Sequence, residues 1–431
     1  MNEEKKLNML QSLVLLLLII GSVAVCIRLK TGGPMIGLFM SWIIIYLFCK
    51  VLKMDYDKVV SGAYDAIRVV VPTLCLLMAI GVMIGTWLQS GTIASIIVGG
   101  LKMINPTWLL PLTLVFCAVL SLVTGTSYGS VGSAGVAMMA IGNAMGINSG
   151  MVAGAVICGA MFGDKLSPLS DTTNLAPAVA GAKLNDHVRS MLWTTLPTFA
   201  ISLVLFTILG ISQTSGGYEE GNLLVYVDAL QGEFKLGIVT LIPAIVIIVL
   251  LLCKVNAIVS LGLSAVCAGA VSWFCQGATL QSIIRVAYNG YSTQIEEAIL
   301  KTILNRGGMS SMLQYVAIIC FAVGMGGMLD RLGVLENILN AITDRIHSDG
   351  SLILASLLVG YVTSLISCSQ PMSHVLTGNM MKPLFKERKI APEILSRTLE
   401  DAGTLSGPMI PWHGYCVYMA GTLGVAWSAF F

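Results

Sequence analysis

The sequence has 431 residues, of which 56% are hydrophobic and only 11% are charged, and its mean hydropathy is +0.86. Soluble globular domains carry about 25% charged residues, and here 24 Lys and Arg against 22 Asp and Glu leave a net charge of +2. This composition excludes an intrinsically disordered protein, a secreted disulfide scaffold and a nucleic-acid binder, and it predicts a polytopic membrane protein.

Long uncharged runs follow one another along the chain. A helix needs about 20 apolar residues to cross the hydrocarbon core, so these runs predict transmembrane helices and not the shorter alternating strands of a barrel. We expect the first run to be a retained helix, since no small-residue cleavage site follows it. The runs predict about 12–14 crossings and lie at residues 13–27, 34–49, 69–101, 103–163, 190–218, 236–253, 255–284, 307–329, 350–373 and 402–431.

The cysteines do not form a metal or disulfide pattern. Eleven Cys are scattered through the apolar runs without a CxxC pair, and neither an HExxH motif nor a clustered Cys/His spacing occurs. In lipid such cysteines are small hydrophobic residues more often than ligands. We therefore expect no metal centre and no cofactor, and because the spacing of Ser and His supports no catalytic triad we also expect no enzymatic activity.

The chain reads as two related halves. Similar short sequences recur in the same order, at offsets between 224 and 243 residues. This order predicts an internal repeat, and chance similarity between apolar sequences is the alternative. The matched pairs are Ala63-Tyr64 with Ala287-Tyr288, Gly81 with Gly324, Gly91 with Gly333, Gly125-Thr126-Ser127 with Ser367-Cys368-Ser369, and Leu166-Ser167-Pro168 with Leu405-Ser406-Gly407-Pro408.

Charge predicts that the halves have opposite orientations. Residues 381–397 contain five Lys and Arg, whereas their first-half counterpart, residues 139–151, contains none. By the positive-inside rule the former is cytoplasmic and the latter external. Opposite orientations require each half to cross the membrane an odd number of times. The count is odd if the short stretches 92–104 and 334–346 also cross, or if the crossings elsewhere are miscounted by the same number. We expect a first inverted repeat at residues 1–210, an acidic external linker at 211–235 and a second inverted repeat at 236–431.

Inverted repeats are the architecture of secondary transporters, which hold their substrate near the midplane of the membrane. The first polar interruption of the helical pattern, residues 124–135, has four Gly and five Ser or Thr amid apolar sequence. Its counterpart is residues 367–374. Each is long enough for a re-entrant hairpin, which is tolerated at membrane depth only where it is buried or lines a watery cavity. A phosphate-binding loop is disfavoured because no Lys follows.

The second interruption, residues 163–177, brings carboxylates into the membrane after 61 uncharged residues. Pro168 and Pro177 remove backbone donors, so nearby carbonyls lose their helical partners. Hydroxyls, freed carbonyls and a carboxylate suit Na⁺, and ionisable residues within a span are functional candidates. The alternative is that Asp164 and Lys165 pair at a helix end. The predicted cation-binding residues are Asp164, Ser167, Ser170, Asp171, Thr172, Asn174, Gly125, Thr126 and Ser127.

The second half has similar Gly, Ser and Pro breaks at residues 401–413, but no carboxylates at the positions aligned with Asp164 and Asp171. Two of only four His residues, His374 and His413, lie at its breaks. These two side chains would act as gates, change their protonation state near neutral pH or bind an anionic solute. The alternative is that each is packed in the protein with one hydrogen bond. The predicted substrate-binding residues are Ser367, Ser369, Gln370, Ser373, His374, Thr404, Ser406, Trp412 and His413.

At residues 162–181, FGDKLSPLSDTTNLAPAVAG, the sequence resembles the NhaC family of Na⁺/H⁺ antiporters, and residues 401–425 resemble the C-terminal pattern of that family. The resemblance implies the ion-transporter superfamily architecture, with inverted repeats, two re-entrant hairpins, broken transmembrane helices and an elevator-like motion. The superfamily includes Na⁺/H⁺ antiporters, malate–lactate exchangers and proposed amino-acid transporters. The motif carries over to Asp164, Ser167, Ser170, Asp171, Thr172, Thr173 and Asn174.

The chain departs from the family pattern on the second-half side. After Pro411-Trp412 the relatives usually have an Asn-Thr-Cys-Gly-like run, whereas this chain has His413-Gly414-Tyr415-Cys416. Pro371 and His374 are also unusual. These departures leave two cargo classes open, an ion alone or an organic solute.

The leading functional prediction is a secondary transporter of the cytoplasmic membrane that exchanges Na⁺ for H⁺ at a carboxylate, foremost Asp171. Burial favours the protonated acid and a bound cation favours the carboxylate, so one Asp can exchange the two. The rival is a Na⁺- or H⁺-coupled exchanger of a small carboxylate or amino acid. We expect the lipid bilayer, Na⁺ and H⁺ as partners, and a homodimer. An intramembrane hydrolase and a passive channel are the less favoured classes.

Overall fold

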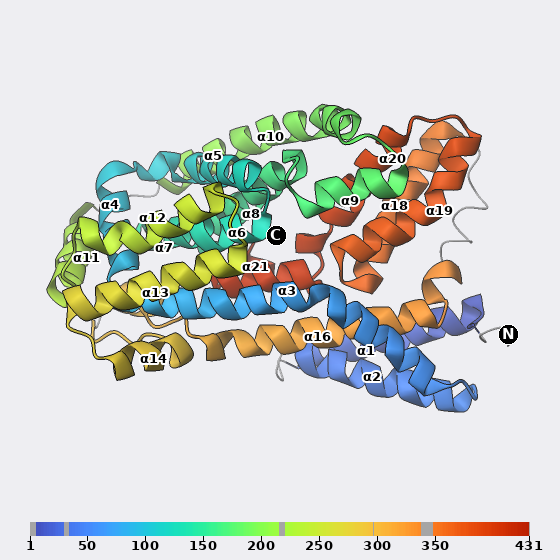
Figure 1. The fold of residues 1–431 in the computed structure, drawn as a ribbon, viewed down its shortest axis with the longest axis horizontal. Helices are drawn as coiled ribbons and strands as arrows, with labels where there is room; N and C mark the ends of the chain where they lie inside the picture. The colour runs from blue at the N-terminus through green and yellow to red at the C-terminus, as the bar shows by residue number, and fades with distance from the viewer. Residues whose placement is uncertain (1–5, 30–33, 215–219, 296, 338–347, 431) are drawn as a thin grey trace. The chain divides into compact units, whose positions relative to one another are not determined.

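The computed structural model describes residues 6–29, 34–214, 220–295, 297–337 and 348–430, and in these ranges every regular element is a helix (Figure 1). The prediction of an all-helical protein is therefore confirmed for this part of the chain. Two compact units divide it, residues 1–74, 172–190 and 314–418 forming the first and residues 75–171, 191–313 and 419–431 the second. Both units contain segments of both predicted repeats, so the repeat boundaries stay a prediction.

Four helices pass from one unit into the other along the chain. They are α3 (Tyr56–Gln89), α10 (Leu184–Thr214), α16 (Met309–Arg331) and α21 (Gly414–Leu423). A fifth helix, α9 (Asp171–Ala180), has its first residue in the second unit and the rest in the first.

The first unit is otherwise built from α1 and α2, which pack against each other, and from a group of helices near the C-terminus. The indole N–H of Trp42 on α2 donates to the Phe321 carbonyl of α16 at 2.9 Å. The helix α18 packs along α19, and both contact α20 and the π-turn η2 (Figure 1). The bounds are α1 (Met9–Arg28), α2 (Pro34–Val51), α18 (Asp349–Ser367), α19 (Gln370–Glu387), α20 (Pro392–Leu399), η2 (Glu400–Thr404) and the 3-10 turn η3 (Gly407–Met409).

The second unit is dominated by two pairs of packed helices, α5 with α8 and α12 with α13. The fully buried Trp87 of α3 donates to Ser264 Oγ of α13 at 2.9 Å, and Ser264 donates to the Pro243 carbonyl of α12 at 2.7 Å. The bounds are α4 (Thr92–Met103), α5 (Pro106–Thr124), α6 (Ser127–Ser130), the π-turn η1 (Val131–Gly135), α7 (Val136–Ala144), α8 (Ser149–Leu166), α11 (Glu220–Glu233), α12 (Ile238–Leu252), α13 (Ala257–Gln276), α14 (Leu280–Asn289), α15 (Ala298–Leu304) and the 3-10 turn η4 (Trp427–Ala429).

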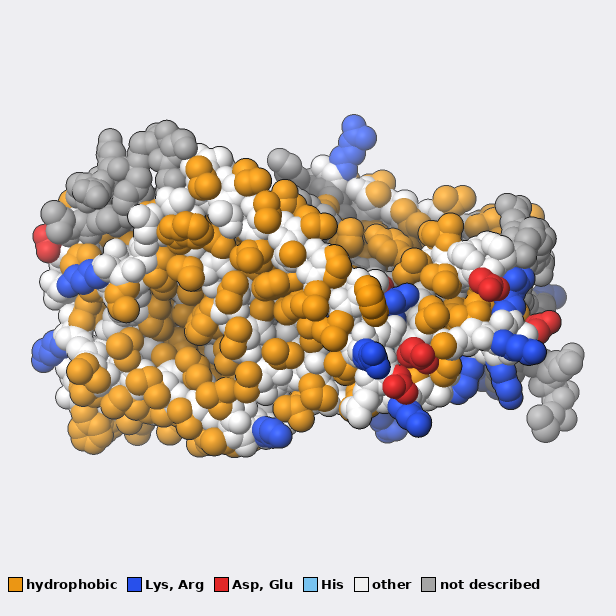
Figure 2. Space-filling model, turned by 90° about the horizontal axis from the view of Figure 1, so that it is seen from above, with side chains coloured by type: hydrophobic (Ala, Val, Ile, Leu, Met, Phe, Trp, Pro, Cys, Tyr) orange, Lys and Arg blue, Asp and Glu red, His pale blue; other side chains and the backbone are white. Residues whose placement is uncertain are grey.

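The surface confirms a multi-pass membrane protein. Large apolar side chains cover much of the face seen in Figure 2, and Phe274 and Val266 of α13 are 84% and 72% exposed. In the described residues, seven helices are long and apolar enough to cross a membrane, or nine if two interrupted pairs count as one span each. This is fewer than the predicted 12–14 crossings, because single uncharged runs are divided among several shorter helices.

The run at residues 103–163 shows this division. It contains α5 and most of α8, each long enough to span, but also the four-residue α6 and the nine-residue α7. The stretch predicted at 92–104 forms the 12-residue apolar helix α4. Most of its predicted counterpart, residues 338–346, lies outside the described residues.

The predicted acidic linker contains helix α11. Its last residue, Glu233, accepts hydrogen bonds from Tyr291 Oη at 2.6 Å and from the Thr293 hydroxyl. Burial and this bond raise the pKa of Tyr291 above its usual range. Glu219 lies outside the described residues, whereas Asp228 is exposed. Glu233 therefore has a structural role that net charge does not reveal.

Close packing of α8 against α5 depends on two glycines one turn apart. A Cβ on Gly159 would overlap the Leu114 carbonyl oxygen, and a Cβ on Gly163 would overlap the Ala118 carbonyl oxygen and lie 2.5 Å from Leu122 N. Small residues let helix backbones approach in membranes, where lipid tails provide no hydrophobic drive for association. The residue after this contact is Asp164.

We predict that Gly163→Ala destabilises the protein by about 1–3 kcal/mol, the usual cost of overpacking, because the Cβ meets main chain, which cannot rotate away. Gly154→Ala on the same helix is the control, since its Cβ would be 3.7 Å from the nearest atom, on the Phe206 ring. The measurement is thermal unfolding of the purified protein in detergent. Equal midpoints for the two variants would contradict the packing argument.

Candidate functional site

The first polar interruption begins where α5 ends at Gly125. Gly125 has φ 71° and ψ 25°, a left-handed conformation that glycine adopts without strain. Thr126 then returns to an extended conformation, and its Oγ1 accepts from Gly129 N at 3.3 Å as the N-cap of α6. A Cβ on Gly125 would lie 2.6 Å from Leu169 Cβ. Glycine at this position therefore lets the α5–α6 turn contact the loop between α8 and α9.

One buried hydrogen bond joins the two polar interruptions of the second unit. Ser127 Oγ, at the start of α6, donates to Asp164 Oδ2, near the end of α8, at 2.7 Å. Ser127 is fully buried and Asp164 is 7% exposed. The predicted Ser127 and Asp164 are thus brought together, 37 residues apart in sequence.

The loop after α8 carries two of the predicted hydroxyls. Ser167 and Ser170 are buried, and Ser167 Oγ accepts from Leu169 N at 3.3 Å. Ser167 N donates to the Asp164 carbonyl at 3.1 Å, and Ser170 N donates to the Ser167 carbonyl at 3.1 Å. Pro168 interrupts the helical pattern, so α8 stops here and a new helix, α9, begins at Asp171.

The remaining predicted cation ligands lie at the start of α9. The Asp171 side chain is exposed, in the first turn of the helix, where a carboxylate interacts favourably with the helix dipole. Thr172 and Thr173 are buried, Asn174 is exposed, and these three belong to the first unit. Asp164 is therefore the buried carboxylate of this motif, and Asp171 has an ordinary helix-terminal position.

The first unit contains a break with the same backbone course. The helix α18 ends at Cys368, a non-glycine residue with φ 55° and ψ 21°, and Ser369 follows at φ −144° and ψ 123°. The corresponding values at Thr126 are φ −149° and ψ 119°. Cys368 thus corresponds to Gly125, one position later than the sequence alignment places it.

A buried polar cluster follows this break. Thr404 Oγ1 donates to Glu400 Oε2 at 2.5 Å and lies 3.0 Å from His374 Nε2. Gln370 Nε2 donates to the Thr404 carbonyl at 3.0 Å, and Ser373 Oγ donates to the Gly360 carbonyl at 2.9 Å. The predicted Gln370, Ser373, His374 and Thr404 are therefore adjacent to one another, around a Glu that was not predicted.

His413 belongs to the same polar region and lies between η3 and the start of α21. Its Nδ1 accepts from Tyr415 N at 3.0 Å, so in the neutral ring the proton is on Nε2. Nε2 is buried and has no hydrogen-bond partner in the described part of the chain. Gly407 provides space for this ring, since a Cβ there would lie 3.3 Å from His413 Cε1 and 3.0 Å from Gln370 Nε2.

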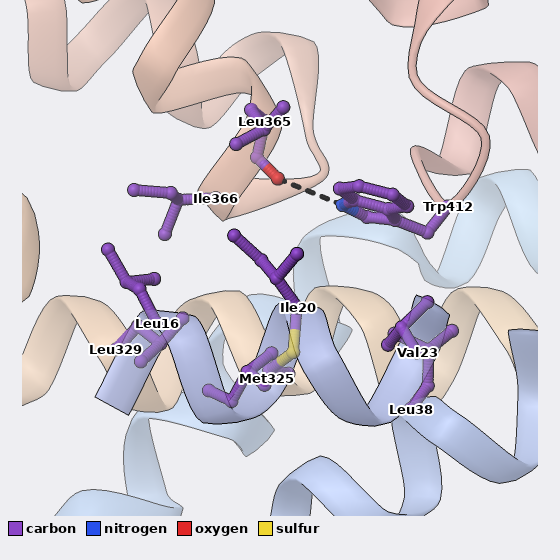
Figure 3. Close-up of a pocket in the computed structure, with 10 residues that line it drawn as sticks. Leu16, Ile20, Val23, Leu38, Met325, Leu329, Leu365, Ile366 and Trp412 are labelled. Carbon is purple, nitrogen blue, oxygen red and sulfur yellow. Dashed lines mark hydrogen bonds between the residues drawn. The ribbon is translucent and has the colours of Figure 1, made fainter. Parts of the chain in front are cut away.

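Trp412 has a different environment from the polar residues predicted with it. Its indole N–H donates to the Leu365 carbonyl at 3.1 Å, and its ring lines a small apolar cavity with side chains of α1, α16 and α18 (Figure 3). The other predicted residues are buried: Ser367 Oγ donates to the Ser369 carbonyl at 3.2 Å, and Ser406 Oγ to the Gly403 carbonyl at 3.4 Å. Trp412 therefore closes the C-terminal end of α18.

The model of the Na⁺/H⁺ antiporter family matches residues 159–429, which include Asp164 and the buried cluster around Thr404. The chain belongs to the Na⁺/H⁺ antiporter family. As a family member it is 34% identical over 98% of its length to the Na⁺/H⁺ antiporter NhaC of Alkalihalophilus pseudofirmus, covering 91% of that protein.

Two other relatives of the chain are named for organic solutes. The chain is 36% identical over 91% of its length to the malate-2H⁺/Na⁺-lactate antiporter of Bacillus subtilis, covering 84% of it. It is 32% identical over 86% of its length to the arginine/ornithine antiporter ArcD of Halobacterium salinarum, covering 77% of it.

Glu400 is the site residue of this antiporter-family chain that sequence reasoning missed. It follows the basic stretch 381–397, so the sequence alone suggests that Glu400 belongs to the same charged cytoplasmic segment. The spacing from Glu400 to Thr404 places both on one helix face, which is the signal that identifies it. The π-turn η2 begins at Glu400, and such turns are frequent at functional sites.

We predict that Trp412→Phe destabilises the protein by about 1 kcal/mol, because the Leu365 carbonyl loses its donor while the apolar contacts are retained. Trp193→Phe is the control, since that ring is 78% exposed. Thermal unfolding in detergent measures both. A midpoint for Trp412→Phe equal to that of Trp193→Phe would remove the structural role assigned to Trp412.

Proposed function

We propose that the protein is a secondary transporter that exchanges Na⁺ for H⁺, with Asp164 as the carboxylate that binds each in turn. The observation that carries this is the buried Ser127–Asp164 hydrogen bond where two helices are interrupted. Membership of the family and the NhaC relative support the ions named.

The chemistry follows from the partners of Asp164. Burial disfavours a charged carboxylate and a bound cation favours it, so protonation and Na⁺ binding exclude each other at one group. The Ser127 hydroxyl donates to the carboxylate in one state, and its oxygen accepts from the acid or faces Na⁺ in the other. Ser167, Ser170, Gly125 and Thr126 complete the proposed cation site of the second unit, whereas the exposed Asp171 takes no part in the proposed exchange step.

The proposed architecture is a pair of inverted repeats, each with a re-entrant hairpin and a broken helix. The matching backbone courses at Gly125-Thr126 and Cys368-Ser369 support it. The physical advantage is that a structure open to one side, repeated upside down, can also open to the other. The midplane position of the site, the cytoplasmic membrane and the homodimer stay predictions of the sequence.

A second candidate function is Na⁺- or H⁺-coupled exchange of a small carboxylate or amino acid. The malate–lactate and arginine/ornithine relatives favour it, together with the buried donor Nε2–H of His413. Gln370, Ser373, His374 and Trp412 were predicted as contacts for such a solute, and the first three are buried polar residues of α19.

We predict that Asp164→Asn abolishes Na⁺-dependent proton movement in proteoliposomes, because Asn neither releases a proton nor neutralises Na⁺. Asp171→Asn retains exchange, because that side chain is exposed at a helix start. The measurement is the change of a pH-sensitive dye inside the vesicles after a Na⁺ pulse. Loss of exchange in Asp171→Asn with exchange retained in Asp164→Asn would transfer the role to Asp171.

We predict that Ser127→Ala raises the Na⁺ concentration for half-maximal exchange about tenfold, since hydrogen bonds to charged groups contribute about 1.5–3 kcal/mol. Ser133→Ala is the matched control, because Ser133 is buried in the same segment but donates to the Gly129 carbonyl. The same vesicle assay over a Na⁺ series measures both variants. An unchanged half-maximal concentration in Ser127→Ala would exclude this hydroxyl from the cation site.

Thermal stability with a panel of small carboxylates and amino acids, each with and without Na⁺, separates the two candidate functions. A ligand that binds only the folded state raises stability by about 2.7 kcal/mol at 100 times its dissociation constant. A pure Na⁺/H⁺ exchanger is stabilised by ions alone, whereas stabilisation by one solute class supports the second candidate.

A further inference from the structure

Glu400, Thr404 and His374 form a continuous buried chain in the first unit. Thr404 Oγ1 is 2.5 Å from Glu400 Oε2 and 3.0 Å from His374 Nε2. Glu400 and His374 are fully buried, and Thr404 is 1% exposed. Two groups that can each take up a proton are thus connected through a single hydroxyl.

We propose that these three residues form a proton relay, a second protonation site of the transporter that is distinct from Asp164. A hydroxyl has only one proton to donate. When Thr404 donates to the Glu400 carboxylate, His374 must therefore donate from Nε2 to Thr404. When Glu400 is protonated and donates to Thr404, the Thr404 proton points to an unprotonated His374 Nε2. The protonation states of Glu400 and His374 are coupled through Thr404.

The transfer step balances in protons and charge. The Oε2–H bond of Glu400 breaks and its proton bonds to Thr404 Oγ1, while the former Thr404 proton leaves for His374 Nε2. The products are a Glu400 carboxylate, a Thr404 hydroxyl that now donates to it, and a His374 imidazolium. No other reactant is needed, and the reverse step restores the protonated acid and the neutral ring.

The surrounding structure holds the relay in place from both sides. Gln370 Nε2 donates to the Thr404 carbonyl and fixes the π-turn η2. Gly403 lets the imidazole lie against that turn, since a Cβ there would be 2.7 Å from His374 Cδ2 and 2.9 Å from Ser373 Oγ. Ser373 in turn is 2.9 Å from Thr363 Oγ1. The relay therefore has a fixed geometry, which proton transfer along hydrogen bonds requires.

Within the first unit, other titratable groups lie on the elements that pack against η2. These elements are α18, α19 and α20. Their further charged side chains, and Asp401 of η2, are exposed or half-buried, whereas His187 of α10 is buried and bonded to Ser396 Oγ of α20 at 2.7 Å. The charged groups are Asp349, Lys382, Lys386, Glu387, Glu393, Arg397 and Asp401.

The role of the relay in transport rests on the proposed Na⁺/H⁺ exchange. With the relay, each transport cycle carries one proton more than Asp164 alone provides. The relay itself is tested without transport. In pH-difference infrared spectra of the purified protein, Glu400→Gln is expected to lose one protonated-carboxyl band. Thr404→Val is expected to shift that band to higher frequency, because the acid loses its acceptor. Glu393→Gln, on the neighbouring α20, is the control and leaves the band unchanged.

These spectra decide the relay. A wild-type spectrum in Glu400→Gln overturns the protonation of Glu400, and a wild-type band in Thr404→Val overturns its connection to Thr404. If Glu400→Gln does not fold, Thr404→Val and Thr404→Ser provide the same comparison, with Ser expected to restore the wild-type band.

The transport test measures the ratio of H⁺ to Na⁺ from the membrane potential at which net flux reverses in proteoliposomes. Glu400→Gln is expected to lower the ratio by one proton per Na⁺, with Na⁺-dependent exchange retained. An unchanged ratio in an active variant overturns the extra proton. Because Asp164→Asn removes exchange altogether if the proposed function holds, and the infrared bands report on Glu400 alone, failure of the relay and failure of the exchange are distinguishable.

Discussion

A carboxylate in an apolar interior needs donors, and an unbroken membrane helix has none to spare because its N–H groups are all bonded within the helix. Asp164 obtains a donor because α5 ends at Gly125 and a new short helix begins with Ser127. That arrangement depends on main-chain contact between α5 and α8 at Gly159 and Gly163. The position of the acid thus follows from two glycines, Gly163 directly before it and Gly159 one turn earlier, and from the left-handed Gly125 at the end of the helix that α8 packs against.

The first unit also interrupts a helix with a left-handed residue, but it does so with different amino acids. Cys368 takes the left-handed conformation that Gly125 takes in the second unit, and Ser369 repeats the extended course of Thr126. A non-glycine residue in this conformation is uncommon, so the backbone course is retained where the sequence no longer favours it. This shared backbone geometry supports the proposed internal repeat, and it places the match one residue later than the alignment of the sequences does.

The sequence reveals much of this because polar residues are conspicuous in apolar runs. The interruption after Thr124 and the motif around Asp164 were both predicted, and the structure places Ser127 beside Asp164. Asp171 is predicted as the exchanging acid because it lies among helix-breaking, oxygen-bearing residues, and spacing alone does not show that it lies at an exposed helix start. Glu400 was missed for the opposite reason. It follows a basic stretch at which the positive-inside rule predicts solvent, and only tertiary packing of η2 against α18 and α19 shows that it is buried.

The number of crossings stays a prediction, because hydropathy measures the medium that a residue prefers and not the length of its helix. Buried protein interior and lipid are equally acceptable to an apolar side chain, so the nine-residue α7 lies in the same uncharged run as the 19-residue α5.

Both buried acids described here receive a hydrogen bond from a hydroxyl, Asp164 from Ser127 and Glu400 from Thr404. A hydroxyl can donate to a carboxylate and can accept from the protonated acid, so it satisfies either state without a large movement. A hydroxyl therefore adds little bias between the protonated and the ionised acid, which suits a group on which protons and cations replace each other in every cycle.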